Sequence, residues 1–116
     1  GPSALQHASE RLKGDFDIVH LAVQRHGDAL QFAGAGLRTN RDIVLEAVRR
    51  DGDALQYAAA SLKDDAAIAM VAVRENAAAL YHVSPRLQHN QAFYHQAMKP
   101  WVLRERWVAN TLCFFS

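Results

Sequence analysis

The sequence predicts an all-α protein, a short α-solenoid of four 25-residue helix-pair repeats closed by a C-terminal capping helix. The first observation behind this prediction is an Ala-Leu pair that returns every 25 residues without insertions. The second is a composition rich in alanine, with only six glycines and three prolines, which favours helices. Fixed-period self-similarity is typical of stacked arrays, in which each unit completes the core of the next. The four copies begin at Ala4, Ala29, Ala54 and Ala79.

The period divides the chain into three parts. Residues 1–3 are interpreted as a tag remnant and a first cap residue, because Gly1-Pro2 is typical of a cleaved expression tag. We therefore expect the natural protein to continue upstream. Residues 4–98 are predicted to hold the four repeats, and residues 99–116 the capping helix.

The first element of each repeat is predicted to be a helix of about nine residues. Asp28 is placed to cap it in the second copy, and Asp53 and Ser3 share that phase. Such side chains accept a hydrogen bond from an unpaired backbone N–H of the first turn. The apolar positions of the second copy are Leu30, Phe32, Ala33 and Leu37.

The second element is predicted to be a helix of about eleven residues that ends at a glycine in the left-handed conformation. Gly27 and Gly52 stand at that end, and Asn76 replaces them in the third copy. Helices this short are marginal in water, so packing between repeats must stabilise them. The predicted N-caps are Asp15, Asn40, Asp65 and Asn90.

The fourth copy differs most from the others and leads into Pro100, which suits the first turn of a new helix. We interpret residues 101–115 as a cap over the open end of the stack. The alternative is an apolar docking face for a partner or a further domain. The stripe consists of Leu103, Trp107, Val108, Leu112 and Phe115.

The repeat has a recognisable motif. It contains Ala-Leu-x-aromatic-Ala, as at residues 54–58, and Asn/Asp-x-x-Ile-Val-x-x-Ala-Val, as at residues 40–48, followed by a glycine. With these features in phase over residues 4–98, the chain resembles a family of tandem helical repeats known only as a domain of unknown function, DUF4116. The resemblance implies a helical array and supplies no catalytic residue. Similar arrays occur in protists, algae and bacterial proteins, some of which resemble secreted effectors.

Composition and charge exclude several classes of function. A net charge of +1 argues against a chain-wide electrostatic footprint for nucleic acid. The single cysteine, Cys113, can form neither an internal disulfide nor a cysteine-based metal site. The sequence has no run of 18 apolar residues, so it predicts no membrane span. The compartment stays open: soluble, cytoplasmic or delivered into a host cell.

The histidines are predicted to be packing residues. His7 and His82 share the position of Phe32 and Tyr57, which favours a flat ring with a polar edge. A zinc site needs three or four converging ligands, and this spacing offers none. We therefore expect no metal and no cofactor.

Basic residues share phases near two turns, which predicts two basic rows along a stack. Such rows could grip an acidic peptide, an acidic protein surface or a phosphate backbone. Alternatively, the cations only complement helix dipoles, and Asp15, Asp64 and Asp65 weaken the row at the first turn. The first row is Lys13, Arg38 and Lys63; the second gathers Arg25, Arg49, Arg50, Arg74 and Lys99.

We predict no enzymatic activity, because the sequence lacks phosphate-binding loops and nucleophile motifs. The favoured function is a protein-binding or scaffolding module within a larger protein. The alternatives are nucleic-acid or phosphate binding along the basic rows, and an accessory domain of an effector enzyme whose active site lies elsewhere. Positions that vary between copies are the candidate partner contacts. They are Arg11, Phe16, His26, Arg41, Glu46, Arg50, Glu75, Arg86 and His89.

One further cluster breaks the repeat. Aromatic and histidine residues crowd the fourth copy, and a specific recognition spot is expected there if the chain has one. They are Tyr81, His82, His89, Tyr94 and His95.

Overall fold

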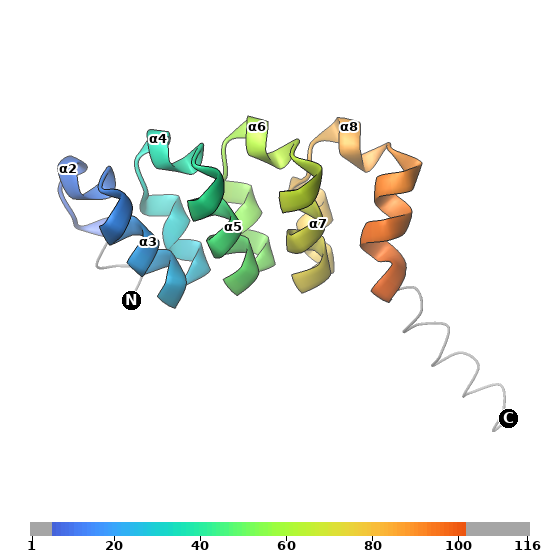
Figure 1. Cartoon of the computed structure of the whole chain (residues 1–116), viewed down its shortest axis with the longest axis horizontal. Coiled ribbons are helices and arrows are strands. Elements are labelled where there is room, and N and C mark those ends of the chain that lie inside the picture. Colours follow the sequence, from blue (N-terminus) through green and yellow to red (C-terminus); the bar gives the residue numbers. More distant parts are fainter. Residues whose placement is uncertain (1–5, 102–116) are drawn as a thin grey trace, which may run out of the picture.

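The computed structural model describes residues 6–101, and every regular element in that range is helical. The longest helices stand side by side in one layer, 3-10 helices lie behind them, and the shortest α-helices follow one edge (Figure 1). Each long helix packs on the next, and the 3-10 helices pack on one another and on the long helices. The predicted capping stripe, residues 102–116, and the cap residue Ser3 lie outside the described residues.

The elements recur in the same order along the chain. The long helices are α3 (Phe16–Arg25), α5 (Arg41–Arg50), α7 (Ala66–Glu75) and a helix at residues 91–101. The 3-10 helices are η1 (Gly27–Phe32), η2 (Gly52–Tyr57) and η3 (Ala77–His82). The short helices are α2 (Glu10–Lys13), α4 (Ala35–Arg38), α6 (Ala60–Lys63) and α8 (Pro85–Gln88).

The predicted N-caps of the long helices are confirmed. The side chains of Asp15, Asn40 and Asp65 each accept two backbone N–H groups from the first turn. Asn90 accepts the N–H of Phe93 in the same way, at 3.0 Å. These bonds satisfy donors that a helix start leaves unpaired, so the sequence alone fixes where each long helix begins.

The predicted nine-residue helix is wrong in the second to fourth copies, because each of them holds a 3-10 helix and a separate α-helical turn instead. Ala33 and Gly34 are extended between them, and the Gly34 N–H donates to the Lys13 carbonyl at 2.9 Å. Matching bonds join Ala59 to Arg38 and Ser84 to Lys63. A hydrogen bond to the neighbouring copy is thus made where a continuous helix would bond to itself.

Three residues carried a signal for this break. Ser84 caps α8 by accepting the Leu87 N–H, and Pro85 occupies the first turn. Ser9 caps α2 likewise through the Leu12 N–H. Serine before proline is a common helix start, and it marks a second helix within the repeat.

The glycines end no helix in a left-handed conformation, since no described residue has a positive φ. A Cβ added to Gly27 would lie 2.5 Å from the Ala47 carbonyl oxygen, and one at Gly52 would clash with the Ala72 carbonyl oxygen. The glycines are therefore required for close approach of η1 to α5 and of η2 to α7.

The predicted caps Asp28 and Asp53 lie inside the first turn of η1 and η2 rather than before it. Asp51 caps η2 by accepting the Asp53 N–H, and Asn76 caps η3 by accepting the Ala78 N–H. His26 stands in this place before η1 and makes no capping bond. The cap is shifted because the 3-10 helix starts directly after the long helix.

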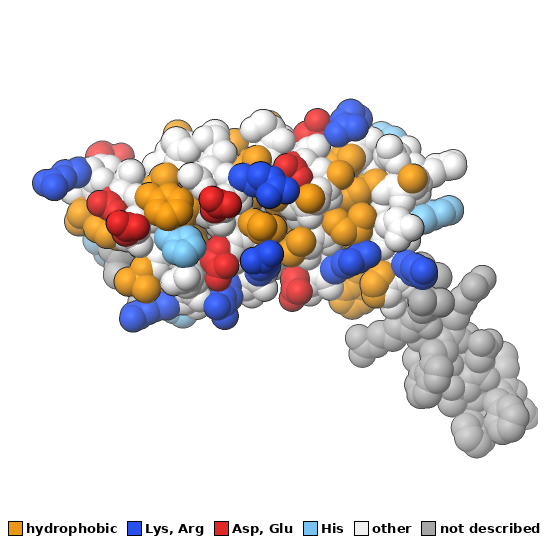
Figure 2. Space-filling model, in the orientation of Figure 1, with side chains coloured by type: hydrophobic (Ala, Val, Ile, Leu, Met, Phe, Trp, Pro, Cys, Tyr) orange, Lys and Arg blue, Asp and Glu red, His pale blue; other side chains and the backbone are white. Residues whose placement is uncertain are grey.

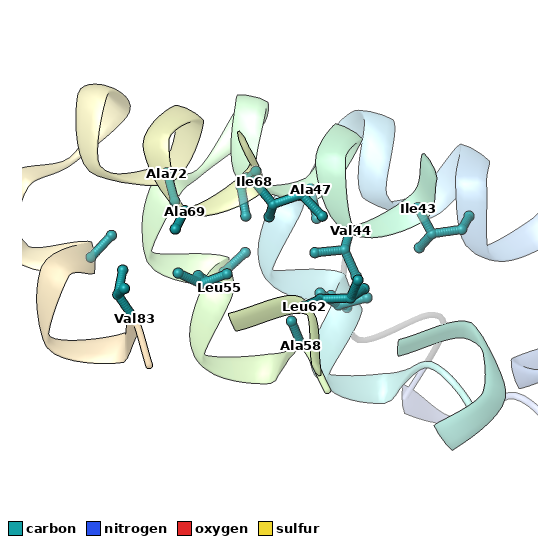
Figure 3. Packing of buried hydrophobic residues seen from close by; sticks show 14 of the residues in the cluster. Ile43, Val44, Ala47, Leu55, Ala58, Leu62, Ile68, Ala69, Ala72 and Val83 are labelled. Carbon is teal, nitrogen blue, oxygen red and sulfur yellow. The ribbon is translucent and has the colours of Figure 1, made fainter. Parts of the chain in front are cut away.

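The core lies between the long helices and the 3-10 helices. Side chains of α5 and α7 point into this space, where they meet Leu55 of η2 (Figure 3). Leu30, Leu55, Ile43 and Ile68 are fully buried. The first layer differs: Ile18 remains 38% exposed, because no described long helix precedes α3. Burial of this kind supplies about 1.5–3 kcal/mol per large apolar side chain.

The last described helix runs from residue 91 to residue 101 without a break at Pro100. A new helix therefore does not begin at Pro100 as expected. The indole Nε1 of Trp101 donates to the Val73 carbonyl at 3.1 Å, which ties this helix to α7.

Candidate interaction surface

The outer face is the solvent-exposed side of α3, α5, α7 and helix 91–101, which faces the reader in Figure 2. In α5 and α7 the third, fourth, seventh and eighth residues are buried in the core. The first, second and ninth residues are exposed, and the fifth and sixth are half-exposed. This division follows from the helical period of 3.6 residues, and it gives every copy the same set of outward positions.

The first outward position carries the aromatic residue that the sequence singled out. Phe16 is 40% exposed and stacks on His20, with ring centroids 5.4 Å apart and planes within 9°. Leu21 is 53% exposed. The outer face of α3 therefore presents apolar surface to solvent.

Ion pairs engage three of the predicted contact residues on the outer face. The Arg41 Nε donates to Asp65 Oδ2 at 3.2 Å, between α5 and the start of α7. Arg50 pairs with Glu46 one turn earlier, at 3.4 Å. These groups hold neighbouring elements or one helix in place, and exposed pairs of this kind contribute about 0–1 kcal/mol each.

Opposing effects set the pKa of Asp65. Partial burial raises the pKa, but the Ile68 N–H, the Arg41 guanidinium and the Ala67 N–H outweigh burial. The net result is a pKa below the ordinary value of 3.8. The carboxylate is thus kept charged by its role as helix cap and ion-pair partner.

The remaining predicted contact residues do not converge. Arg11 lies on α2 and Arg86 on α8, both at the edge of short helices. Glu75 ends α7, while His26 and His89 follow α3 and α8. All five are exposed, but they are divided between the edge and the far ends of the long helices, so the nine residues form no single site.

Arg86 is engaged in the most extensive polar bridge of the described residues. Its Nε donates to Asp64 Oδ1 at 2.9 Å, and the Ser84 hydroxyl donates to the same oxygen at 2.6 Å. The hydrogen bond from Ser84 and then that from Arg86 lower the pKa of Asp64 below 3.8. This bridge joins α8 to the residue after α6.

The first basic row is not an open charged surface. Lys13, Arg38 and Lys63 are all half-buried. The Arg38 guanidinium donates to the carbonyls of Ala33 and Gln31, which stabilises the break between η1 and α4. In this row, Arg38 therefore serves the fold.

The histidine cluster of the fourth copy is likewise divided. His82 Nε2 lies 3.0 Å from Asp53 Oδ1, so its ring packs with a polar edge between η3 and η2 as predicted. Tyr81 is 84% exposed on η3, whereas Tyr94 and His95 are ring neighbours on the last helix, 6.4 Å apart. Within residues 6–101 no three histidine, cysteine or acidic side chains gather as metal ligands do.

Two groups on the outer face lie outside the predicted contact set. The basic row, as the name is used from here on, consists of the ninth residues of three consecutive long helices: Arg49, Arg74 and Lys99. The apolar floor consists of half-buried side chains beside that row: Leu45, Met70 and Val71. The three cations were already part of the second predicted row, whereas the apolar floor could have been found by aligning the copies and taking the outward positions together.

Comparison with known proteins gives one match. The family model described as "Domain of unknown function (DUF4116)" matches residues 1–38 and 40–88, so the chain belongs to that family. No curated protein and no solved structure matches the chain significantly. Among residues 6–101, no helix combines the length and the apolar character needed to cross a membrane.

Proposed function

We propose that this member of the DUF4116 family is a non-catalytic protein-binding or scaffolding module, built as a short α-solenoid of four repeats within a larger protein. Its partner is another protein, held on the outer face of the long helices.

Regular connections between neighbouring copies support the solenoid. Backbone bonds from Gly34 to Lys13, from Ala59 to Arg38 and from Ser84 to Lys63 are 2.9, 3.0 and 3.1 Å long. Each long helix packs on the next, and each η helix on the next. Such an array grows by nearest-neighbour contacts and presents an extended surface.

The observation that carries the binding role is the contrast between inward and outward positions. The third residue of the long helices is always large and apolar: Ile18, Ile43, Ile68 and Phe93. The first residue, which faces out, changes character in every copy: Phe16, Arg41, Ala66 and Gln91. Because the fold does not need one kind of residue there, the outer face is available to recognise a partner.

The charged groups support a non-catalytic role. Among residues 6–101, two carboxyl groups have shifted pKa values, Asp64 and Asp65, and hydrogen bonds and arginine partners lower both. A general acid at neutral pH needs the opposite shift. Both carboxylates have structural partners that join one element to another.

The test is affinity capture with cross-linking, followed by calorimetry on the purified partner and the full chain. A variant with Phe16→Ala and Arg41→Ala removes outward side chains of α3 and α5. Glu10→Ala, on a side chain of α2 that is 92% exposed and lies at the edge away from the long helices, is the control. We expect the first variant to weaken binding and the control to bind as the natural chain does.

Failure to bind any protein, with circular dichroism showing a folded array, would contradict the proposed function. Equal affinity of both variants and the natural chain would place the partner elsewhere on the molecule.

A further inference from the structure

The basic row is the part of the outer face where exposed cationic side chains have no ion-pair partner among residues 6–101. Arg49, Arg74 and Lys99 are exposed, and within residues 6–101 none of them makes an ion pair or a side-chain hydrogen bond. The neighbouring Arg50, by contrast, is paired with Glu46. Blue side chains follow the lower ends of the long helices in Figure 2. One cation per helix is thus presented to solvent along the stack.

The apolar floor runs beside this row. Leu45 and Met70 stand one turn before Arg49 and Arg74, on the same side of their helices. Val71 lies next to Met70, and all three apolar side chains are half-buried against the core. A ligand along the row therefore meets charge on one side and apolar surface on the other.

The spacing of the row favours an extended peptide. Packed helices lie about 8–10 Å apart, so the cations recur at about that interval. A polyproline II strand rises about 3.1 Å per residue with three residues per turn. Every third side chain of such a strand therefore returns to the same side after about 9 Å.

Nucleic acid fits this surface less well. Glu46 and Glu75 stand near the row on α5 and α7, and Asp42 lies on the outer face of α5. A nucleic-acid backbone carries closely spaced charges along its whole length, and it would bring phosphates against these carboxylates. A peptide can place neutral residues there.

We propose that the basic row and the apolar floor bind an extended acidic segment of another protein. Carboxylates at every third position of the segment pair with the row, and apolar side chains between them lie on the floor. This inference rests on the proposed function and names its partner by chemistry.

The experiment is an NMR titration of the isotopically labelled full chain with a nine-residue peptide of three Glu-Pro-Leu units. A second peptide of equal composition has its three glutamates adjacent. We expect amide shifts along α5, α7 and helix 91–101, and about threefold tighter binding of the first peptide, because only its charges match the row.

A charge-reversal pair supplies the matched control. Arg49→Glu with Arg74→Glu should weaken the binding of the peptide with spaced glutamates by about tenfold. Arg11→Glu with Lys13→Glu on α2 changes the net charge equally away from the long helices and should weaken binding of that peptide less than twofold. Circular dichroism checks that both variants stay folded.

Three outcomes would overturn the inference: equal effects of both reversals, equal binding of both peptides, or tighter and steeply salt-dependent binding of an oligothymidine, which would indicate nucleic acid. A natural protein partner that is indifferent to Arg49→Glu with Arg74→Glu would overturn the inference and leave the proposed function standing. Absence of any protein partner would overturn both.

Discussion

The centre of the array and its C-terminal end are joined in different ways. At the centre, Gly27 and Gly52 allow η1 and η2 to approach α5 and α7 so closely that no Cβ would fit. Ala77 occupies this position at the C-terminal end and carries that Cβ. In the same part of the chain Leu80 is half-buried, whereas its equivalent Leu55 is fully buried.

Polar bridges hold the C-terminal end where close packing is reduced. His82 bonds to Asp53, Ser84 and Arg86 bond to Asp64, and Trp101 bonds to Val73. One copy earlier, 25 residues before, other residues occupy the positions of these bridging side chains. Tyr57, Ala59 and Ser61 stand there, facing Asp28 and Thr39, and no side-chain bridge is formed between them. The centre does have one ion pair between helices, Arg41 with Asp65.

Neighbouring copies of the sequence period are thus joined in two different ways. Apolar close packing is insensitive to pH and salt, whereas bridges of exposed charges are weak and depend on both. The C-terminal end should therefore open first.

The largest expected difference is between two equivalent leucines. Leu55→Ala should lower the free energy of unfolding by about 3 kcal/mol, because the buried side chain leaves a cavity. Leu80→Ala should cost about half as much, since Leu80 is half-buried. Urea denaturation followed by circular dichroism measures both, and equal losses would remove the distinction between centre and end.

A glycine substitution tests the close approach directly. Gly52→Ala should lower the free energy of unfolding by about 2 kcal/mol, because the new Cβ meets the Ala72 carbonyl oxygen. The control is Gly36→Ala on α4, where nothing lies within 4 Å of the added Cβ. The control should stabilise the protein by about 0.5–1 kcal/mol through helix propensity. Thermal unfolding would contradict this account if both variants shifted in the same direction.

The reverse substitution at the C-terminal end should have a smaller effect. Ala77→Gly removes the Cβ without a clash, and the main cost is added backbone freedom in the unfolded chain, about 0.5–1 kcal/mol. Urea denaturation should thus place this variant well above Gly52→Ala in stability. A loss of equal size would show that Ala77 packs as closely as its counterparts.

Acid should have the smallest of these effects on stability, and it should weaken the C-terminal end first. Hydrogen bonds from Ser84 and Arg86 lower the pKa of Asp64 below 3.8 in the folded chain. The carboxylate therefore contributes stability that is complete above pH 3.8 and is lost as the pH falls through the folded pKa. Hydrogen exchange measured by peptide should show that η3 and α8 lose protection before η1 does.

Asp64→Asn is the control for the acid experiment, because it removes the titrating group. Its η3 and α8 segments should show a smaller dependence on acid than the natural chain. Simultaneous opening of all segments in both proteins would contradict a weaker C-terminal end.

The sequence by itself determined the period, the helical class and the starts of the long helices. Asn40 and its equivalents act within one turn, so their effect depends only on residues close in the chain. The same holds for the inward apolar positions, because the helical period places them on one side. The first residues of the outer face were also identified, although not the basic row and apolar floor as one surface.

Only the tertiary structure explains the need for glycine at positions 27 and 52. It also explains the break between the 3-10 helix and the short α-helix. Both depend on groups about 20 residues away, the Ala47 carbonyl for Gly27 and the Lys13 carbonyl for Gly34. The sequence could not show whether these glycines end a helix in the left-handed conformation or allow close backbone approach, because both situations favour glycine. The contact that selects between them exists only after neighbouring copies have packed.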